Sequence, residues 1–338
     1  MDRTFTSYRV EDRSFVSYIK REIHGHVAHA HFSEGRAGEI DIIVSELCSN
    51  LVKHASSGEL LYRVCDIGEK NSRFEIVCID KGPGMGDVPR MMKDGVSTTN
   101  TLGQGLGAIE RLGDVSQVYS MPGWGTIVYV MVTTEATKYN ARPALEVDIR
   151  ALNINKPREV VCGDGYRIKR TNTQVQIFFG DGLGHGQYAK EAVDSAGNFF
   201  MGCGESDPVS IIRLIHEEVR RTRGLVMTMA IGDLKTGEWS ICGVGNILTR
   251  LYSGVTYRNY MSYNGTAGMN IPNSMKASVY KMEKNQHLIM CSDGIRSRWD
   301  VSRYPSIFKY DSTLLAAALY SDFSRGNDDS SILIAKVS

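Results

Sequence analysis

Two glycine-rich stretches decide the fold of the first part of this sequence: Asp80-Lys-Gly-Pro-Gly-Met85 and Leu102-Gly-Gln-Gly-Leu-Gly107. The first follows the apolar run 73–80, so Asp80 is expected at a strand end, beside glycines that let a ligand approach the backbone. The second opens a helix, and its backbone N–H groups would lie at the positive end of the helix dipole, where phosphates bind. Either motif alone is weak evidence for a nucleotide site, because glycines also mark ordinary turns.

A pair of polar residues lies upstream of these motifs. Glu46 and Asn50 are four positions apart on a predicted helix that ends near Ala55, so both point to one side. The opposite stripe holds Ile43, Leu47 and Leu51, which places that side in the core. A carboxylate can accept a proton and an amide oxygen can ligate Mg²⁺, although such a pair is usually only a solvated helix face.

The three elements in this order, together with Gly125-Thr126 in a predicted hairpin, resemble the Bergerat-type ATPase domain of gyrases, histidine kinases and anti-sigma switch kinases. The resemblance covers about residues 10–134 and implies an α/β sandwich that binds ATP and Mg²⁺. It also implies that Asp80 contacts the adenine amino group, Asn50 binds Mg²⁺ and Glu46 acts as general base. The other nucleotide-binding residues that it implies are Gly82, Gly84, Gly103, Gly105, Gly107 and Thr126.

Two features favour one branch of these ATPases. The segment 95–101 is short for a lid, and the runs 105–114 and 123–126 are similar to serine kinases of the RsbT/RsbW type, which phosphorylate Ser or Thr on STAS-domain partners. A histidine kinase needs an acceptor histidine followed by an acidic residue, and none of His24, His26, His29 and His31 has one. These histidines, of which only His26 and His29 share a helical face closely, are interpreted as a surface or interface cluster.

The chain is expected to divide after this ATPase-like part. The polar segment 133–143 is nearly free of large aliphatic residues, which is typical of a linker. The predicted organisation is a first domain over 1–135, a linker over 136–143 and a second domain over 144–338. Strands are expected at 60–67, 73–80, 115–121, 126–132, 174–180, 225–233, 238–242, 247–251, 286–291 and 331–337, and helices at 15–27, 40–55, 188–200, 209–221 and 312–322. This distribution predicts the α+β class for both domains.

Four aspartate motifs recur in the second domain: Cys162-Gly-Asp164-Gly, Phe179-Gly-Asp181-Gly-Leu-Gly-His185-Gly, Cys291-Ser-Asp293-Gly and Asn327-Asp328-Asp329-Ser. Asp-Gly is a common turn dipeptide, so each motif alone predicts only a turn. Carboxylates at several strand ends can, however, converge on hard divalent cations, and an adjacent glycine lets its carbonyl join the coordination. Two such ions can activate water and hold a phosphoryl group.

These motifs resemble the metal-dependent protein phosphatases of the SpoIIE branch, with the run from Asp181 most similar to the RsbX type. The resemblance covers roughly residues 144–338 and implies a β-sandwich flanked by helices, with two Mg²⁺ or Mn²⁺ ions. It implies that Asp181 and Asp293 are the catalytic metal ligands. The full set of implied ligands is Asp164, Asp181, the carbonyl of Gly182, Asp293 and Asp328, with Asp329 the less favoured of its pair.

Two departures from the phosphatase pattern leave roles open. Animal-type enzymes carry His directly after the Asp-Gly as a candidate general acid, and here that position is Leu183. Leaving-group protonation then falls either to a water on the metal or to His185. No arginine near the start of the domain clearly matches a phosphate clamp, and Arg158 and Arg167 are the nearest candidates.

Composition restricts the class of protein. The 338 residues carry 39 Lys+Arg against 38 Asp+Glu, so the net charge of +1 argues against nucleic acid or a membrane surface as partner. Seven scattered cysteines without a C-x-x-C pair predict free thiols in a reducing compartment. The first residues lack the apolar segment of a signal peptide, and no run of about 18 apolar residues occurs, so a cytoplasmic location is expected.

The two resemblances together predict a bifunctional switch that phosphorylates and dephosphorylates a STAS-domain protein of the anti-sigma-antagonist kind. The alternative is a phosphatase whose first domain is a nucleotide-gated binding module without kinase activity. A sigma factor or a stressosome-like complex is a further candidate partner. The oligomeric state is left open, with a homodimer as one candidate.

Overall fold

The computed structural model describes residues 4–10, 13–55, 57–68, 71–91, 105–134, 146–254 and 256–338. The chain divides into two compact units, one of residues 1–140 with 306–318 and the other of residues 141–305 with 319–338. The predicted linker 136–143 lies outside the described residues, as do the segment 95–101 and Gly103. The domain boundaries therefore stay a prediction.

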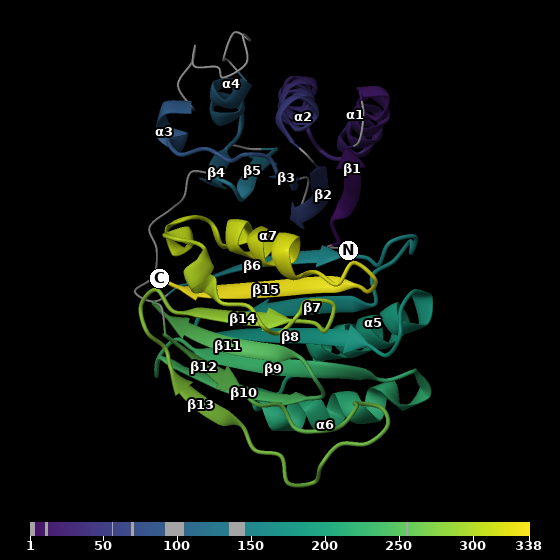
Figure 1. The fold of residues 1–338 in the computed structure, drawn as a ribbon. Helices are drawn as coiled ribbons and strands as arrows, with labels where there is room; N and C mark the ends of the chain where they lie inside the picture. Colours follow the sequence, from purple (N-terminus) through teal and green to yellow (C-terminus); the bar gives the residue numbers. More distant parts are fainter. Residues whose placement is uncertain are drawn as a thin grey trace. The chain divides into compact units, whose positions relative to one another are not determined.

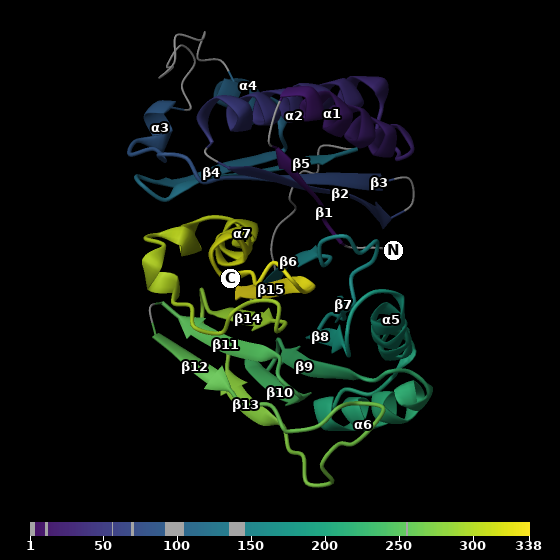
Figure 2. The ribbon, with the colours of Figure 1, turned by 45° about the vertical axis from the view of Figure 1, so that its right-hand side comes forward.

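The first unit is one antiparallel sheet with helices on one face (Figure 1). The strand order is β1-β2-β3-β5-β4, and α1, α2 and α4 cover the same side in both views (Figure 2). The strands are β1 (Thr6–Val10), β2 (Gly58–Gly68), β3 (Asn71–Asp80), β4 (Val115–Met121) and β5 (Gly125–Thr133), and the helices are α1 (Arg13–Ala28), α2 (Glu34–His54), α3 (Val88–Met91) and α4 (Gly105–Leu112).

Alternation along the central strands explains this layer. Phe74, Ile76 and Cys78 of β3 point to the helices and are buried with Ile43 and Leu47 of α2. A strand with period-two alternation and a helix with apolar residues three and four apart bury their faces against each other. The helical stripe that the spacing of α2 predicts is therefore the stripe that the structure buries.

The second unit is a β-sandwich flanked by helices. One sheet has the order β13-β10-β9-β8-β7 and the other β12-β11-β14-β15-β6. The strands are β6 (Val147–Ile154), β7 (Asp164–Arg170), β8 (Gln174–Gly182), β9 (Leu225–Asp233), β10 (Glu238–Val244), β11 (Leu248–Ser253), β12 (Thr256–Tyr260), β13 (Ser278–Lys281), β14 (His287–Cys291) and β15 (Ser330–Val337). Helices α5 (Gln187–Gly202) and α6 (Pro208–Glu218) lie against the first sheet (Figure 1), and α7 (Ser312–Phe323) spans the division between the units.

Strand β8 shows how the sandwich is layered. Ile177 and Phe179 join the core between the two sheets, whereas Phe178 packs with Phe200 of α5 in the layer under the helices. Both faces of β8 are therefore buried, which agrees with its nearly continuous apolar sequence. The predicted α+β class, with an α/β sandwich followed by a β-sandwich flanked by helices, is confirmed.

Five strands were not predicted from the sequence: β1, β6, β7, β12 and β13. All five lie at the edges of their sheets. An edge strand has one neighbour and carries more polar residues than a central one, so its alternation is weak. The chain consequently begins with a strand rather than with the predicted helix.

Candidate functional site

Helix α2 presents Glu46 and Asn50 on its polar side. Its first turn is capped by Ser33, whose hydroxyl accepts the Arg36 N–H at 3.3 Å. Ile43, Leu47 and Leu51 on the other side are buried, whereas Glu46 and Asn50 are partly exposed. The predicted pair therefore lies on an accessible surface of the helix, with its backbone held by the core.

The start of α4 meets this pair. A Cβ atom added to Gly105 would lie 2.7 Å from Oε2 of Glu46 and 3.9 Å from Oδ1 of Asn50. Only glycine leaves the Glu46 carboxylate in this position, because real Cβ contacts are never that short. Gly107, two residues further along α4, is buried. The structure thus brings Glu46, Asn50 and Gly105 of the second glycine motif together.

Asp80 and Thr126 form the other end of the candidate nucleotide site. They face each other in the register of β3 and β5. Oδ1 of Asp80 accepts the Gly82 N–H at 2.5 Å, and the Thr126 hydroxyl is 2.9 Å from that of Ser120. Ser120 also accepts the Met85 N–H at 2.7 Å, so it ties the loop after Asp80 to the β4–β5 hairpin. Ser120 was not predicted, because nothing in its local sequence marks it.

Two glycines of this region are required by close backbone contacts. Gly84 has φ +68°, and a Cβ there would lie 1.9 Å from the Met121 carbonyl oxygen. Gly125 has φ +130°, and its Cβ would lie 2.1 Å from the Asp80 carbonyl oxygen. Neither position can hold a side chain without a shift of backbone. The glycines therefore allow the loop after Asp80 and the hairpin to approach each other.

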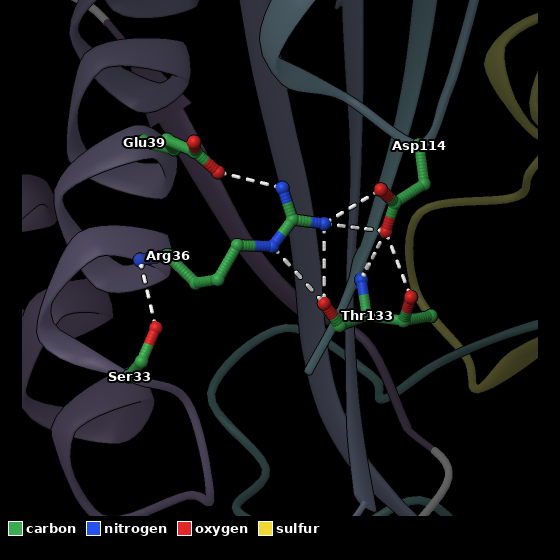
Figure 3. A network of polar contacts seen from close by, with 5 residues as sticks. All are labelled: Ser33, Arg36, Glu39, Asp114 and Thr133. Atoms are coloured by element: carbon green, nitrogen blue, oxygen red, sulfur yellow. Dashed lines mark hydrogen bonds and ion pairs between the residues drawn. The ribbon is translucent and has the colours of Figure 1, made fainter. Parts of the chain in front are cut away.

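An arginine network holds α2 against the sheet (Figure 3). The Arg36 guanidinium donates to both oxygens of Asp114 at 2.6 Å and to Glu39 at 2.6 Å. It also donates to the Thr133 carbonyl, and Asp114 accepts the Thr133 N–H at 2.6 Å. Burial lowers the pKa of Arg36, but the hydrogen bonds to Glu39 and Asp114 outweigh it and raise the pKa overall. The network fixes the helix that carries Glu46.

We expect Asp114→Asn to lower the free energy of unfolding of the first unit by about 2 kcal/mol, because it removes one of the two carboxylates paired with the partly buried Arg36. Denaturant titration followed by circular dichroism measures this. Asp41→Asn is the matched control: its ion pair with His24 is exposed, so a loss below about 0.5 kcal/mol is expected. Equal losses in the two variants would show that Asp114 has no special role.

The candidate phosphatase site begins at one end of the first sheet of the second unit. Asp164 and Asp181 face each other in the register of β7 and β8. Gly182 follows, and a Cβ there would lie 2.3 Å from the Ala189 carbonyl oxygen of α5. The helix therefore packs directly on the strand end, and the close approach depends on glycine at 182.

The second sheet brings Asp293 and Asp328 to the same region. Asp293 follows β14 and Asp328 precedes β15, which pair along their length. Nδ2 of Asn246 donates to Oδ2 of Asp293 at 3.2 Å. Asn246 was not predicted as a site residue.

Electrostatics show that these carboxylates are close together. Burial raises the pKa of Asp181 well above its usual range, and the charges of Asp164 and Asp293 raise it further. Burial likewise raises the pKa of Asp164 to about 7, with Asp329 and Asp293 adding to the effect. Oδ2 of Asp164 is buried and has no hydrogen-bond partner among the described residues. Carboxylate oxygens that lie close together and repel one another are suitable ligands for hard divalent cations.

The metal-ligand set nevertheless stays a prediction. In the part of the chain that the structure describes, no three His, Cys, Asp or Glu side chains are already arranged to hold a metal ion. Asp329 has a different position from its neighbour: its two oxygens accept the N–H groups of Lys156 and Gly163 at 2.8 and 2.9 Å. It is therefore occupied in holding backbone, which agrees with Asp328 as the favoured ligand of the pair.

The structure shows the surroundings of the candidates for the phosphate clamp and for the general acid. Arg167 donates to Asp194 at 2.8 Å and lies along Gly197 of α5, so it fastens a helix. Arg158 is exposed and has φ +75°. His185 contacts Oε1 of Glu159 at 2.7 Å, and the sequence offered no signal for Glu159.

The N-terminal histidines do not share one helical face. Helix α1 ends at Ala28, so His29 and His31 lie beyond it, and the predicted pairing of His26 with His29 on one face is wrong. His24 contacts Asp41, whereas His26 contacts the Tyr62 hydroxyl at 2.8 Å. The helix ends one residue after the predicted range 15–27, and it does not include His29.

Comparison with known proteins finds relatives of a kinase kind and of a phosphatase kind. Residues 12–131 match the family described as the histidine kinase-like ATPase domain. The serine/threonine-protein kinase RsbT of Bacillus subtilis (strain 168) is 38% identical over 88 residues, which are 26% of this chain and 65% of the kinase. The chain thus spans slightly less than two thirds of that kinase.

The second half matches a phosphatase. The phosphoserine phosphatase RsbX of the same organism is 24% identical over 144 residues, which are 42% of this chain and 71% of the phosphatase. A solved structure from work on the bacterial stressosome has a TM-score of 0.52 at 26% identity and covers 57% of this chain and all of that chain. The structure of RsbX in complex with magnesium also has a TM-score of 0.52, at 20% identity, over 59% of this chain and 98% of that chain. The predicted resemblance to a kinase of the RsbT type followed by a phosphatase of the RsbX type is confirmed.

Among the described helices, none combines the length and the apolar character that crossing a membrane requires.

Proposed function

We propose that this chain is a bifunctional partner-switching regulator, which phosphorylates a serine or threonine of a STAS-domain protein with ATP and removes phosphate from it with Mg²⁺ or Mn²⁺. The observation that carries the proposal is that each unit has its own polar constellation on its own fold. Glu46 and Asn50 meet Gly105 in the first, and Asp181 lies opposite Asp164 in the second.

In the first unit, the residues suit transfer of a phosphoryl group from ATP. Asp80 and Thr126 would hold the adenine, and Asn50 would hold Mg²⁺. The N–H groups at the start of α4 would bind phosphate oxygens. Glu46 would accept the proton of the substrate hydroxyl, because its carboxylate is partly exposed beside the start of α4.

In the second unit, Asp181, Asp293, Asp328 and the carbonyl of Gly182 would hold two divalent ions, with Asp164 as a further ligand. When bound, the ions supply Lewis-acid activation of water and of the phosphoryl oxygens. The protein keeps the carboxylates in place: Asn246 donates to Asp293, and Asp329 ties the backbone at 156 and 163.

The partner and the location follow from the same proposal. RsbT and RsbX are a kinase and a phosphoserine phosphatase, and one protein substrate for both units would make the chain a switch. A sigma factor or a stressosome-like complex would then act downstream, and the chain would form a homodimer. All seven cysteines are free, which supports a cytoplasmic location.

The direct test uses the full-length chain and a purified STAS-domain protein. ATP and Mg²⁺ should produce phosphorylated partner, and Mn²⁺ without ATP should release phosphate from it, both followed by mass spectrometry of the intact partner. Absence of both reactions would refute the proposal.

A second candidate keeps the phosphatase and makes the first unit a nucleotide-gated binding module. Its support is that similarity to the kinase covers only 65% of that protein. The position of Glu46 favours the kinase, because a binding module needs no base there.

Glu46→Gln separates the two. If Glu46 is the general base, we expect phosphoryl transfer to fall by about 10²–10⁴-fold. Calorimetry should show a nucleotide Kd changed by less than about 3-fold, since the glutamine makes similar contacts. Glu34→Gln, an exposed glutamate on the same helix, serves as the control and should keep full transfer. Unchanged transfer in Glu46→Gln would favour the binding module.

A further inference from the structure

A histidine and a glutamate form a half-exposed pair at the loop that follows Asp181 and Gly182, two of the candidate metal ligands. Nδ1 of His185 is 2.7 Å from Oε1 of Glu159, and the two side chains are 47% and 31% exposed. A carboxylate can only accept a hydrogen bond, so Nδ1 must donate the proton. The other ring nitrogen, Nε2, has no bond to Glu159 and is the one available to a substrate.

The pair belongs to the same strand ends as the aspartates. His185 lies three residues after Gly182, and its Cα is 3.8 Å from where a Cβ of Gly163 would be. The Gly163 carbonyl accepts the Gly182 N–H at 3.1 Å, and Gly163 directly precedes Asp164. The imidazole is therefore attached to the backbone that presents Asp164 and Asp181.

Glu159 sits on a loop that is tied at both ends. Asp329 accepts the N–H groups of Lys156 and Gly163, which flank Glu159. Oε2 of Glu159 also lies 3.0 Å from the position of a Cβ on Gly186. Gly186 thus leaves room for the carboxylate, and Asp329 holds the loop that carries it.

The other histidines of the second unit are engaged elsewhere. His216 is buried, and its Nδ1 accepts the Gly268 N–H at 3.0 Å. His287 is buried in β14, and burial together with the charge of Lys336 lowers its pKa to about 4. Among the described residues of this unit, His185 is consequently the one imidazole that combines exposure with a place at the aspartates.

We propose that His185 is the general acid of the phosphatase reaction and that Glu159 is the residue that positions it. This rests on the proposed phosphatase function. Water attacks phosphorus and forms the new P–O bond while the bond between phosphorus and the serine oxygen breaks. The electron pair of that bond stays on the serine oxygen, which takes the proton from Nε2. A proton lost by the attacking water returns to Nε2 through solvent, so the products are serine and inorganic phosphate.

Two arginines, Arg158 and Arg223, lie near the pair of His185 and Glu159. Arg223 would contact a Cβ on Gly184 at 2.8 Å and stacks 5.0 Å from the Tyr188 ring, and Arg158 precedes Glu159. Both are exposed. They can attract the phosphorylated segment, but an arginine remains protonated and cannot give its proton to the leaving serine.

The leaving group provides the test. The serine of a phosphoserine leaves as a strongly basic alkoxide and needs the proton, whereas p-nitrophenyl phosphate releases p-nitrophenolate, which is a stable anion. With Mn²⁺ at saturation, His185→Gln should lose about 10²-fold or more in kcat on a phosphoserine peptide and less than about 3-fold on p-nitrophenyl phosphate. Glu159→Gln should show the same pattern at about 10-fold, because the acid remains but its orientation is lost.

Two further measurements separate catalysis from structure. Calorimetry should show Mn²⁺ affinity unchanged in both variants, and ¹⁵N NMR of histidine-labelled protein should show that Glu159→Gln alters the tautomer of His185. Glu191→Gln, an exposed glutamate on α5, is the control and should be within about 2-fold of the wild type on both substrates. Equal losses on the two substrates, or none, would overturn the proposal. A wild-type protein inactive on both would refute the phosphatase function itself and the acid with it.

Discussion

Asp181→Asn is expected to lower phosphatase activity by at least about 10³-fold, because it removes a negative oxygen donor from the centre of the proposed metal site. Release of phosphate from p-nitrophenyl phosphate with Mn²⁺ measures the effect. Asp181 lies opposite Asp164 at the strand ends, where no other residue of β8 can replace its carboxylate. Asp233→Asn is the control: this aspartate caps the turn after β9 and should keep full activity.

The same substitution should act in the opposite direction on stability. Burial and the nearby carboxylates raise the pKa of Asp181 above its unfolded value, so the folded metal-free protein binds a proton more tightly than the unfolded chain. Its stability must therefore fall as the pH rises from about 4 through the raised pKa. A neutral asparagine removes this cost, and the Tm of the metal-free variant at neutral pH should rise. An active variant, or one with a lowered Tm, would contradict the role of Asp181.

Gly84→Ala should weaken nucleotide binding by more than about 10-fold, a loss of about 1.4 kcal/mol or more in binding free energy. The added Cβ would lie 1.9 Å from the Met121 carbonyl oxygen. The loop after Asp80 must then move away from the β4–β5 hairpin, which also carries Thr126. Titration calorimetry with ATP analogues on the full-length chain measures the change in Kd.

Gly123 offers a matched control for backbone strain. It has φ +76°, close to the φ of +68° at Gly84, but no atom lies within 4 Å of its added Cβ. Gly123→Ala should therefore lose only about 1 kcal/mol of stability and keep its nucleotide affinity. If both variants bound nucleotide equally well, the close contact at Gly84 would have no part in the site.

Periodicity identified the buried elements of both units. Leu225–Asp233 and Val115–Met121 were predicted at their observed bounds, and the buried stripe of α2 follows from its sequence. The edge strands were missed because their outer side is solvated. Strand β7, for example, alternates apolar residues with Arg167 and Lys169 and carries its site residue, Asp164, at its first position.

Motifs predicted most of the candidate site residues. They did not predict the residues that form hydrogen bonds with those residues or with their loops. Asp80, Asp181 and Asp293 are recognisable because glycines follow them at strand ends. Ser120, Asn246 and Glu159 have ordinary surroundings in the sequence, and they matter only because folding brings a partner from elsewhere in the chain.

The sequence by itself determined the order of the two folds and predicted the candidate site residues of each, because spacing and residue type are local properties. Only the tertiary structure decided which aspartate of the pair 328–329 holds backbone and which imidazole lies beside the loop after Asp181. Asp329 reaches Lys156 and Gly163 across more than 160 residues of chain. Such contacts depend on how two sheets stack, and no local pattern encodes that arrangement.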